Sequence, residues 1–562
     1  MTTDPGLLKL VNGVLWPGFT GLSVPSWLGH ALDDGLAGVV YFGQNIDPAD
    51  ADQPARLSAA LRGIRSDVLI GSDEEGGNVT RLDAARGSSL PSHAQLGHID
   101  DLAATRWVGT ALGAQAVSAG VNVVLGPVAD VTTQLANPVI GVRSFGSTPE
   151  LVGRHVAAMI DGLQSSGVAA CVKHFPGHGD THTDSHLALP RLDLSWAEIE
   201  RMHLPPFLAA IEADVRAVMT AHIVVPEFGD APATLNARVL QELRDRGFTG
   251  TIITDALDMA AISETVGAGP GAVQALLAGS ELLCIGNPAN VASRVDVDDY
   301  REVRDALLAA VADGVLGTDV LERAGASVAR LAAGVAPAGS GAAGSGAAGS
   351  GAAASGAAAV SAAAPVSAAA GSGAAGSSAA DFGAAGSSAA DSGTAGSSAA
   401  GSGAAGSGAA VSGAAAFDSA TLVRAGITVH GNVVLPERLL TILDVRARPS
   451  LAVSSLLDAF SEEFELQFNV DRQLVGPSAS AAGTAAQAVA AGRSIVVLAD
   501  RIATAGPQRD AVECILAARP HAVVVNAGLA APTPGPGAGI DARAASRATA
   551  QVVRDLLAEA AV

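Results

Sequence analysis

Residues 169–174, with the sequence Ala-Ala-Cys-Val-Lys-His, form a short apolar run that ends in two polar side chains. The same pattern returns at 217–222, Ala-Val-Met-Thr-Ala-His, and at 251–255, Thr-Ile-Ile-Thr-Asp. Apolar runs of this length are typical of strands that are buried on both faces of a parallel sheet. Polar residues that follow several such strands would meet at one edge of the sheet, where a barrel enzyme holds its reacting groups.

Eight such runs occur before residue 290, and longer amphipathic segments separate them. The expected strands lie at 11–15, 38–42, 68–73, 121–125, 169–174, 217–222, 251–255 and 281–284. One intervening segment, 195–213, begins with a capping box, in which Ser195 is followed three residues later by Glu198. This α/β pattern predicts a (β/α)8 TIM-like barrel over residues 1–337, with a doubly wound open sheet as the alternative.

Residues 338–416 are almost wholly Ala, Gly and Ser. Such a segment has too little apolar surface to offset its ordering entropy, so a disordered, flexible linker is predicted. Three further buried strands are expected beyond it, at 440–445, 494–498 and 522–526. Residues 417–562 are therefore predicted to form a smaller α/β sandwich domain, tethered at long range and with an architectural or interaction role.

The composition of the chain indicates which partners and which location are expected. The formal net charge is −22, which argues against nucleic acid and anionic membranes as partners. No run of bulky apolar residues is long enough to span a membrane. The N-terminus lacks the basic and apolar regions of a signal peptide, and the three cysteines are far apart. These features predict a cytoplasmic protein and leave its oligomeric state open.

The segment richest in ionisable residues is 173–186, Lys-His-Phe-Pro-Gly-His-Gly-Asp-Thr-His-Thr-Asp-Ser-His. Its histidines recur at every fourth residue, which on a helix would form a one-sided metal ladder. Pro176 and the glycines disfavour such a helix, so no metal site is predicted. A glycine-rich loop with a close Asp and His suits a mobile acid/base arm, in which Asp184 would orient His186 to donate a proton.

Asp255 ends a second segment of chemical interest, because it follows the apolar run 250–253 after a single threonine. A carboxylate at this position would point into the mouth of a barrel, where it could attack the anomeric carbon of a sugar. It could equally cap the helix that follows, a position that Asp favours. Position alone leaves both roles open.

Together these residues resemble a known family. The stretch 173–190 resembles the signature of the β-N-acetylglucosaminidase branch of glycoside hydrolase family 3. Further segments support the resemblance in family order: Asp73-Glu-Glu-Gly-Gly, Asn137-Pro-Val-Ile-Gly-Val-Arg143-Ser-Phe-Gly, Met219-Thr-Ala-His222 and Thr254-Asp255-Ala-Leu-Asp-Met259. The resemblance is weak over the C-terminal domain and absent over the linker. One departure is Asn78, where some relatives have Arg.

The resemblance implies a role for each matching residue. Asp255 matches the nucleophile that forms a covalent glycosyl-enzyme, His186 matches the general acid/base, and Asp184 matches its partner. Four residues match those that hold the hydroxyls of the sugar in the −1 subsite: Asp73, Arg143, Lys173 and His174. No cofactor is implied.

The function expected from the resemblance is retaining hydrolysis of terminal β-linked N-acetylglucosamine (N-acetylhexosamine) from muropeptide or chitin-type oligosaccharides. In the cytoplasm, such an enzyme would act on imported fragments, as in peptidoglycan recycling. A histidine admits an anionic acceptor more easily than a carboxylate does, so phosphorolysis of the same glycosides is one alternative. The other is a catalytically silent sugar-binding or wall-sensing protein, which the intact Asp255, Asp184 and His186 disfavour.

Overall fold

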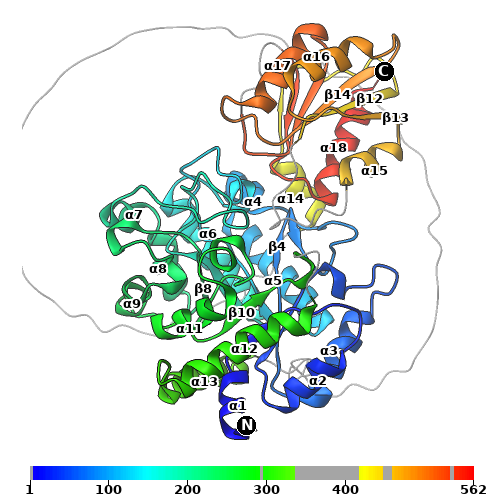
Figure 1. Ribbon diagram of the computed structural model, residues 1–562. Helices are drawn as coiled ribbons and strands as arrows, with labels where there is room; N and C mark the ends of the chain where they lie inside the picture. Colours follow the sequence, from blue (N-terminus) through cyan, green and yellow to red (C-terminus); the bar gives the residue numbers. More distant parts are fainter. Residues whose placement is uncertain (1–3, 291–294, 336–416, 447–457, 532–536, 562) are drawn as a thin grey trace, which may run out of the picture. The chain divides into compact units, whose positions relative to one another are not determined.

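The computed structural model describes residues 4–290, 295–335, 417–446, 458–531 and 537–561. The predicted linker, 338–416, lies outside these residues. Met1–Gly341 and Phe417–Val562 together form one compact unit. Figure 1 shows that the first of these segments builds a barrel of strands and helices, and that the second builds a sheet covered by helices.

Among the described residues, eight parallel strands form the barrel. Six of them pair in the order β2-β3-β6-β7-β8-β9, and β1 pairs with β10. Isolated parallel bridges, Gly18 with Val40 and Ile253 with Leu282, join the two sheets and close the ring. The strands are β1 Leu15–Pro17, β2 Gly38–Tyr41, β3 Leu69–Ser72, β6 Val123–Val124, β7 Ala169–Phe175, β8 Ala217–Thr220, β9 Thr251–Ile253 and β10 Leu283–Gly286. The predicted barrel is confirmed, and the open sheet is not found.

Apolar side chains fill both the inside of the ring and the layer beneath the helices. Neighbouring residues on one strand alternate between these layers, because strand side chains have a period of two. Leu69 and Met219 belong to the inner cluster, whereas Ile70 and Val218 belong to the outer one. Burial on both faces explains why the strands read as continuous apolar runs.

Helices cover the outside of the barrel (Figure 1). A short antiparallel hairpin follows β3. The helices are α1 Pro5–Asn12, α2 Ser26–Asp33, α3 Gln53–Ile64, α4 His93–Ile99, α5 Leu102–Ala119, α6 Pro149–Ser165, α7 Trp196–Met202, α8 Pro205–Glu212, α9 Ala237–Asp245, α10 Ala260–Ser263, α11 Ala268–Ala278, α12 Asp296–Ala312 and α13 Thr318–Ala333. The hairpin strands are β4 Glu74–Gly76 and β5 Val79–Thr80. In the described part of the chain, no helix combines the length and the apolar character that a bilayer crossing requires.

The first strand lies later in the chain than the sequence pattern predicts. The expected strand at 11–15 is wrong over most of its length, because Val11 belongs to α1. Asp4 caps this helix by accepting a hydrogen bond from the N–H of Gly6, and Pro5 is its first residue, as proline often is. Strand β1 begins only at Leu15.

The helix expected over 195–213 is interrupted. Helix α7 ends at Met202, and Pro205 begins α8, because proline lacks the N–H that would continue the first helix. The capping box between Ser195 and Glu198 at the start of α7 is confirmed.

The C-terminal segment forms a six-stranded sheet in the order β11-β16-β15-β14-β12-β13, parallel except for β11. Helices α15 and α18 pack on one face and α16 and α17 on the other, which is the predicted α/β sandwich (Figure 1). The strands are β11 Thr428–His430, β12 Leu439–Asp444, β13 Asn469–Leu474, β14 Ser494–Ala499, β15 Val523–Asn526 and β16 Gly539–Asp541. The helices are α14 Ser419–Ala425, α15 Ala459–Glu465, α16 Ala479–Ala488, α17 Pro507–Ala518 and α18 Arg547–Glu559.

The C-terminal domain is docked on the barrel, which differs from the expected long-range tether. The hydroxyl of Ser92 donates a hydrogen bond to the carbonyl of Arg543 (2.8 Å). The amide of Gln95 donates to the carbonyl of Ala542 (2.8 Å). Leu422 of α14 belongs to the outer core cluster of the barrel. The two domains therefore share polar and apolar contacts within one folded unit.

Close packing of α5 against α6 depends on glycine. A Cβ atom on Gly162 would lie 2.2 Å from the carbonyl oxygen of Arg106. We expect Gly162→Ala to lower the free energy of unfolding by about 1–3 kcal/mol, because the helix backbones must separate. In α3, Gly63 has no atom within 4 Å of such a Cβ, so Gly63→Ala should be neutral or stabilising. Urea unfolding followed by circular dichroism measures both variants, and equal losses at the two positions would contradict the packing argument.

Candidate active site

A small cavity of about 70 Å³ lies at the carboxyl ends of the barrel strands. Six of the residues singled out from the sequence line it: Asp73, Arg143, Lys173, His174, His186 and Asp255. The seventh, Asp184, is not part of the lining but contacts His186. The structure therefore brings together all seven residues, although they span more than 180 positions of the chain.

Asp255 follows β9, and its side chain faces the cavity. Its Oδ1 accepts a hydrogen bond from the N–H of Ala256 (2.8 Å). It does not cap the next helix, because the residue before α10 is Met259. Burial raises the pKa of Asp255, but nearby histidines outweigh burial and hold this pKa below its ordinary value. These histidines are His222, His174 and His186. The carboxylate is therefore ionised at neutral pH, as a nucleophile must be.

His186 and Asp184 form a contact on the loop after β7. The Nδ1 atom of His186 lies 2.8 Å from Oδ1 of Asp184, which also accepts a hydrogen bond from the backbone N–H of His186 (3.0 Å). Asp184 is buried, whereas His186 reaches the cavity. A carboxylate at Nδ1 holds the proton there, so Nε2 is the ring nitrogen that can exchange a proton with a bound molecule.

Side-chain hydrogen bonds, and not a helix, shape this loop. The ring of His178 contacts the hydroxyls of Thr181 (2.8 Å) and Ser185 (3.1 Å). Burial lowers the pKa of His178 to about 4, so this ring is neutral. The carbonyl of Ser185 accepts a hydrogen bond from the N–H of Ala261, which ties the loop to the segment after Asp255. Within the described ranges, no three His, Cys, Asp or Glu side chains are grouped to hold a metal ion.

A chain of alternating charges borders the other side of the cavity. The ammonium of Lys173 lies 2.7 Å from a carboxylate oxygen of both Asp73 and Glu75. Glu75 also forms a two-point ion pair with Arg143 (2.8 and 2.9 Å), and Asp73 pairs with Arg81 (3.1 Å). Burial raises the pKa of Asp73, but the adjacent cations lower it to about 2. These groups therefore stay charged and present fixed donors and acceptors to the cavity.

Sequence reasoning missed Glu75, Arg81 and Asp130. Asp130 is fully buried, and its carboxylate lies 2.7 Å from Nδ1 of His174. It also accepts a hydrogen bond from the backbone N–H of His178 (2.7 Å). Asp130 therefore fixes the orientation of the His174 ring through Nδ1. Asp130 lies six residues beyond the end of β6, so no strand-end pattern in the sequence marks it.

Two polar residues near Asp255 form hydrogen bonds with the segments that surround the cavity. His222 does not line the cavity: its Nε2 lies 2.9 Å from the carbonyl of Ala256. Asp258 accepts hydrogen bonds from the N–H of Asn287 (3.1 Å) and the side chain of Asn290 (3.1 Å). Both asparagines line the cavity, so Asp258 holds one of its walls.

This arrangement agrees with a match to a known family. The family model "Glycosyl hydrolase family 3 N terminal domain" matches residues 28–331, more than half of the chain. The chain belongs to glycosyl hydrolase family 3. The match covers every cavity residue named above and ends near the close of the barrel.

Relatives of known name support the membership in family 3. The chain is 36% identical over 310 residues to a beta-hexosaminidase of Xanthomonas euvesicatoria pv. vesicatoria, covering 52% of this chain and 89% of that protein. It is 30% identical over 321 residues to beta-hexosaminidase A of Pseudoalteromonas piscicida, but spans only 53% of that relative. The family match and the names of these relatives together identify the chain as a glycoside hydrolase.

A solved family 3 structure resembles the whole chain. It is the glycoside hydrolase family 3 beta-N-acetylglucosaminidase from Paenibacillus sp. str. FPU-7, with a TM-score of 0.73 and 26% identity. The comparison covers 99% of this chain and 97% of that one. The similarity therefore extends to the C-terminal domain, beyond the residues that the family model matches.

The contrast between two neighbouring aspartates tests the nucleophile. Asp255→Ala should lower kcat by about 10³-fold or more, because an alanine side chain cannot attack the anomeric carbon. Asp258→Asn should change kcat by less than about tenfold and act mainly on KM, because it loosens the asparagine wall. Steady-state kinetics on 4-nitrophenyl β-N-acetylglucosaminide measures both, and similar losses in kcat would remove Asp255 from this role.

Proposed function

We propose that this family 3 enzyme hydrolyses terminal β-linked N-acetylglucosamine with retention of configuration. The observation that carries the proposal is the contact of His186 with Asp184, at the same cavity as the ionised Asp255. The beta-hexosaminidase and beta-N-acetylglucosaminidase names of the relatives support the choice of sugar. We further propose muropeptide or chitin-type fragments in the cytoplasm as its substrates, as in peptidoglycan recycling.

In the first step, a carboxylate oxygen of Asp255 attacks the anomeric carbon of the bound sugar. The bond between that carbon and the leaving oxygen breaks, and the oxygen takes the electron pair. Protonated His186 donates its Nε2 proton to this oxygen, so the leaving group departs as an alcohol. Asp184 stabilises the imidazolium before the transfer and keeps the ring oriented during it.

In the second step, water replaces the leaving group. Neutral His186 removes a proton from water through Nε2, and the hydroxyl forms a bond with the anomeric carbon. The ester bond to Asp255 breaks, and its carboxylate regains the electron pair. Two displacements on opposite faces of the sugar return the original β configuration.

The paired charged residues beside the cavity are proposed to bind the sugar. Asp73 and Lys173 are held in place by each other and by Arg81 and Glu75, so they are ordered before a sugar arrives. Arg143 and His174 are fixed in the same way by Glu75 and Asp130. We assign Asp73, Arg143, Lys173 and His174 to the hydroxyls of the −1 sugar.

Leaving-group dependence tests the acid/base role of His186. An activated aryl group departs without protonation, so His186→Ala should spare formation of the glycosyl-enzyme from such a substrate. Hydrolysis of the intermediate should still slow by about 10²–10⁴-fold, because water then lacks a base. Mass spectrometry should detect the accumulated intermediate, and azide should restore turnover because an anion needs no deprotonation.

Two controls accompany this experiment. Asp184→Ala should give a milder form of the same pattern, because His186 remains but loses its orienting carboxylate. Turnover with added phosphate tests the acceptor, since release of a sugar 1-phosphate would assign phosphorolysis instead. Equal losses for activated and unactivated leaving groups, without azide rescue, would show that His186 only supports the loop.

A further inference from the structure

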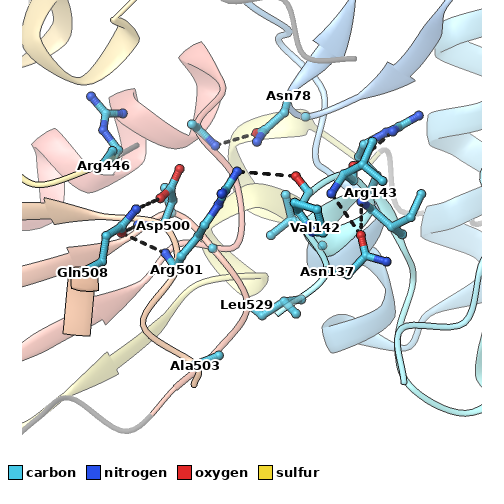
Figure 2. A pocket seen from close by; sticks show the side chains of 18 of the residues that line it. Asn78, Asn137, Val142, Arg143, Arg446, Asp500, Arg501, Ala503, Gln508 and Leu529 are labelled. Atoms are coloured by element: carbon cyan, nitrogen blue, oxygen red, sulfur yellow. Dashed lines mark hydrogen bonds between the residues drawn. The ribbon is translucent and has the colours of Figure 1, made fainter. Parts of the chain in front are cut away.

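Arg143 belongs to a barrel loop that has a cavity on each side. It lines the small cavity beside Asp255, and it also lines a larger cavity of about 730 Å³ whose walls come from the barrel and from the C-terminal domain (Figure 2). Atoms that border a cavity have no packing partners on that side, so packing alone holds such a loop weakly. The position of Arg143 therefore depends on individual hydrogen bonds.

Hydrogen bonds hold Arg143 at both of its ends. Its guanidinium forms the two-point ion pair with Glu75 (2.8 and 2.9 Å). Its backbone carbonyl accepts a hydrogen bond from Nδ1 of His93 (2.6 Å). Burial lowers the pKa of His93 to about 4, so the ring is neutral and carries its one N–H at Nδ1, where the carbonyl can accept it. His93 thus fixes the backbone from which the Arg143 side chain extends.

The helix that carries His93 lies directly against the loop of Arg143. His93 is the first residue of α4, and its ring stacks on that of Phe145 with the ring centres 4.2 Å apart. One turn later, a Cβ atom on Gly97 would lie 1.7 Å from the carbonyl oxygen of Phe145, so the helix and the loop meet backbone to backbone. A shift of α4 would therefore move the loop.

The C-terminal domain binds the same turn of α4. The hydroxyl of Ser92 donates to the carbonyl of Arg543, and the amide of Gln95 donates to the carbonyl of Ala542, both at 2.8 Å. His93 lies between these two residues in the chain, and all three side chains are buried. One helix turn therefore bonds to the C-terminal domain through Ser92 and Gln95 and to the sugar-site loop through His93.

A second contact of the C-terminal domain reaches the partner of Arg143. Asn78, in the turn between β4 and β5, accepts a hydrogen bond from the N–H of Ala545 (2.6 Å, Figure 2). Strand β4, just before this turn, contains Glu75. The C-terminal domain thus contacts both segments whose charges meet at Arg143.

We propose that His93 is a positioning residue of the sugar site and that the C-terminal domain influences sugar binding through it. This inference rests on the proposed function, in which Arg143 binds a hydroxyl of the −1 sugar. His93 orders Arg143 before the sugar arrives, so less conformational freedom is lost on binding. Within the described ranges, no C-terminal residue lines the cavity beside Asp255, so this domain acts on affinity from outside the cavity.

Substitutions of His93 test its positioning role. His93→Ala removes the donor to Arg143 and should raise about tenfold both KM for 4-nitrophenyl β-N-acetylglucosaminide and Ki for free N-acetylglucosamine. The value of kcat should change by less than about threefold, because the reacting groups are intact. His93→Leu fills the space of the ring without a donor and should behave like His93→Ala, whether or not the alanine variant folds.

A conservative variant and a matched control separate positioning from stability. His93→Asn places an amide N–H near the position of Nδ1 and should return KM and Ki to within about threefold of wild type. Among the described residues, Nε2 of His93 has no hydrogen-bond partner, so asparagine gives up no other polar contact. His155 is buried and also stacks on Phe145 (5.2 Å), but it contacts Thr105 instead of Arg143. His155→Asn should leave both constants within about twofold.

A double-mutant cycle tests the route from the C-terminal domain. Gln95→Ala removes a bond to that domain and should raise Ki for N-acetylglucosamine about threefold when His93 is present. In the His93→Leu background it should have no further effect, because the bond to Arg143 is already absent. Thr549→Val, in α18, removes a second acceptor of the Gln95 amide (3.1 Å) and completes the same cycle if Gln95→Ala does not fold.

The outcomes distinguish this inference from the proposed function. Additive effects in the cycle, or equal losses for His93→Leu and His93→Asn, would overturn the inference while wild-type turnover of 4-nitrophenyl β-N-acetylglucosaminide still supports the proposed function. Absence of that turnover in the wild-type enzyme would overturn both.

Discussion

A buried ammonium group, that of Lys173, imposes the main constraint on the active site. An ion removed from water costs several kcal/mol unless opposite charges and hydrogen bonds replace its hydration. Asp73 and Glu75 provide this replacement, each at 2.7 Å, and two arginines balance these carboxylates in turn. These groups come from β7, from the segment after β3 and from the loop before α6. Neutralisation of one lysine therefore fixes the positions of three distant segments around the cavity.

The sequence predicts the barrel well because its strands are buried on both faces and read as uninterrupted apolar runs. Strand β13 was missed for the opposite reason: its residues, Asn-Val-Asp-Arg-Gln-Leu, are mostly exposed at the edge of the C-terminal sheet and form no such run. The candidate site was found through motifs that surround its residues. Glu75 and Asp130 were missed because their importance lies in partners 68 and 44 positions away, which a local pattern cannot reveal.

The sequence did not predict that the C-terminal domain docks on the barrel. The departure at Asn78 has a local explanation, because its side chain accepts a hydrogen bond from the N–H of Ala545 (2.6 Å, Figure 2). The proposed acid/base is on a barrel loop, so the C-terminal domain has no proton to deliver. In the proposed mechanism, every reacting group belongs to the barrel.

The capping box at the start of α4 has a consequence for how the protein comes apart. Ser92 and Gln95 satisfy each other's backbone N–H groups, and the same two side chains bind carbonyls of the C-terminal domain. Fraying of this helix end would therefore release the docked domain, and separation of the domains would leave the cap with fewer partners. Local melting and domain release are thus coupled at one helix turn, and the two domains are expected to lose their structure in a single cooperative transition.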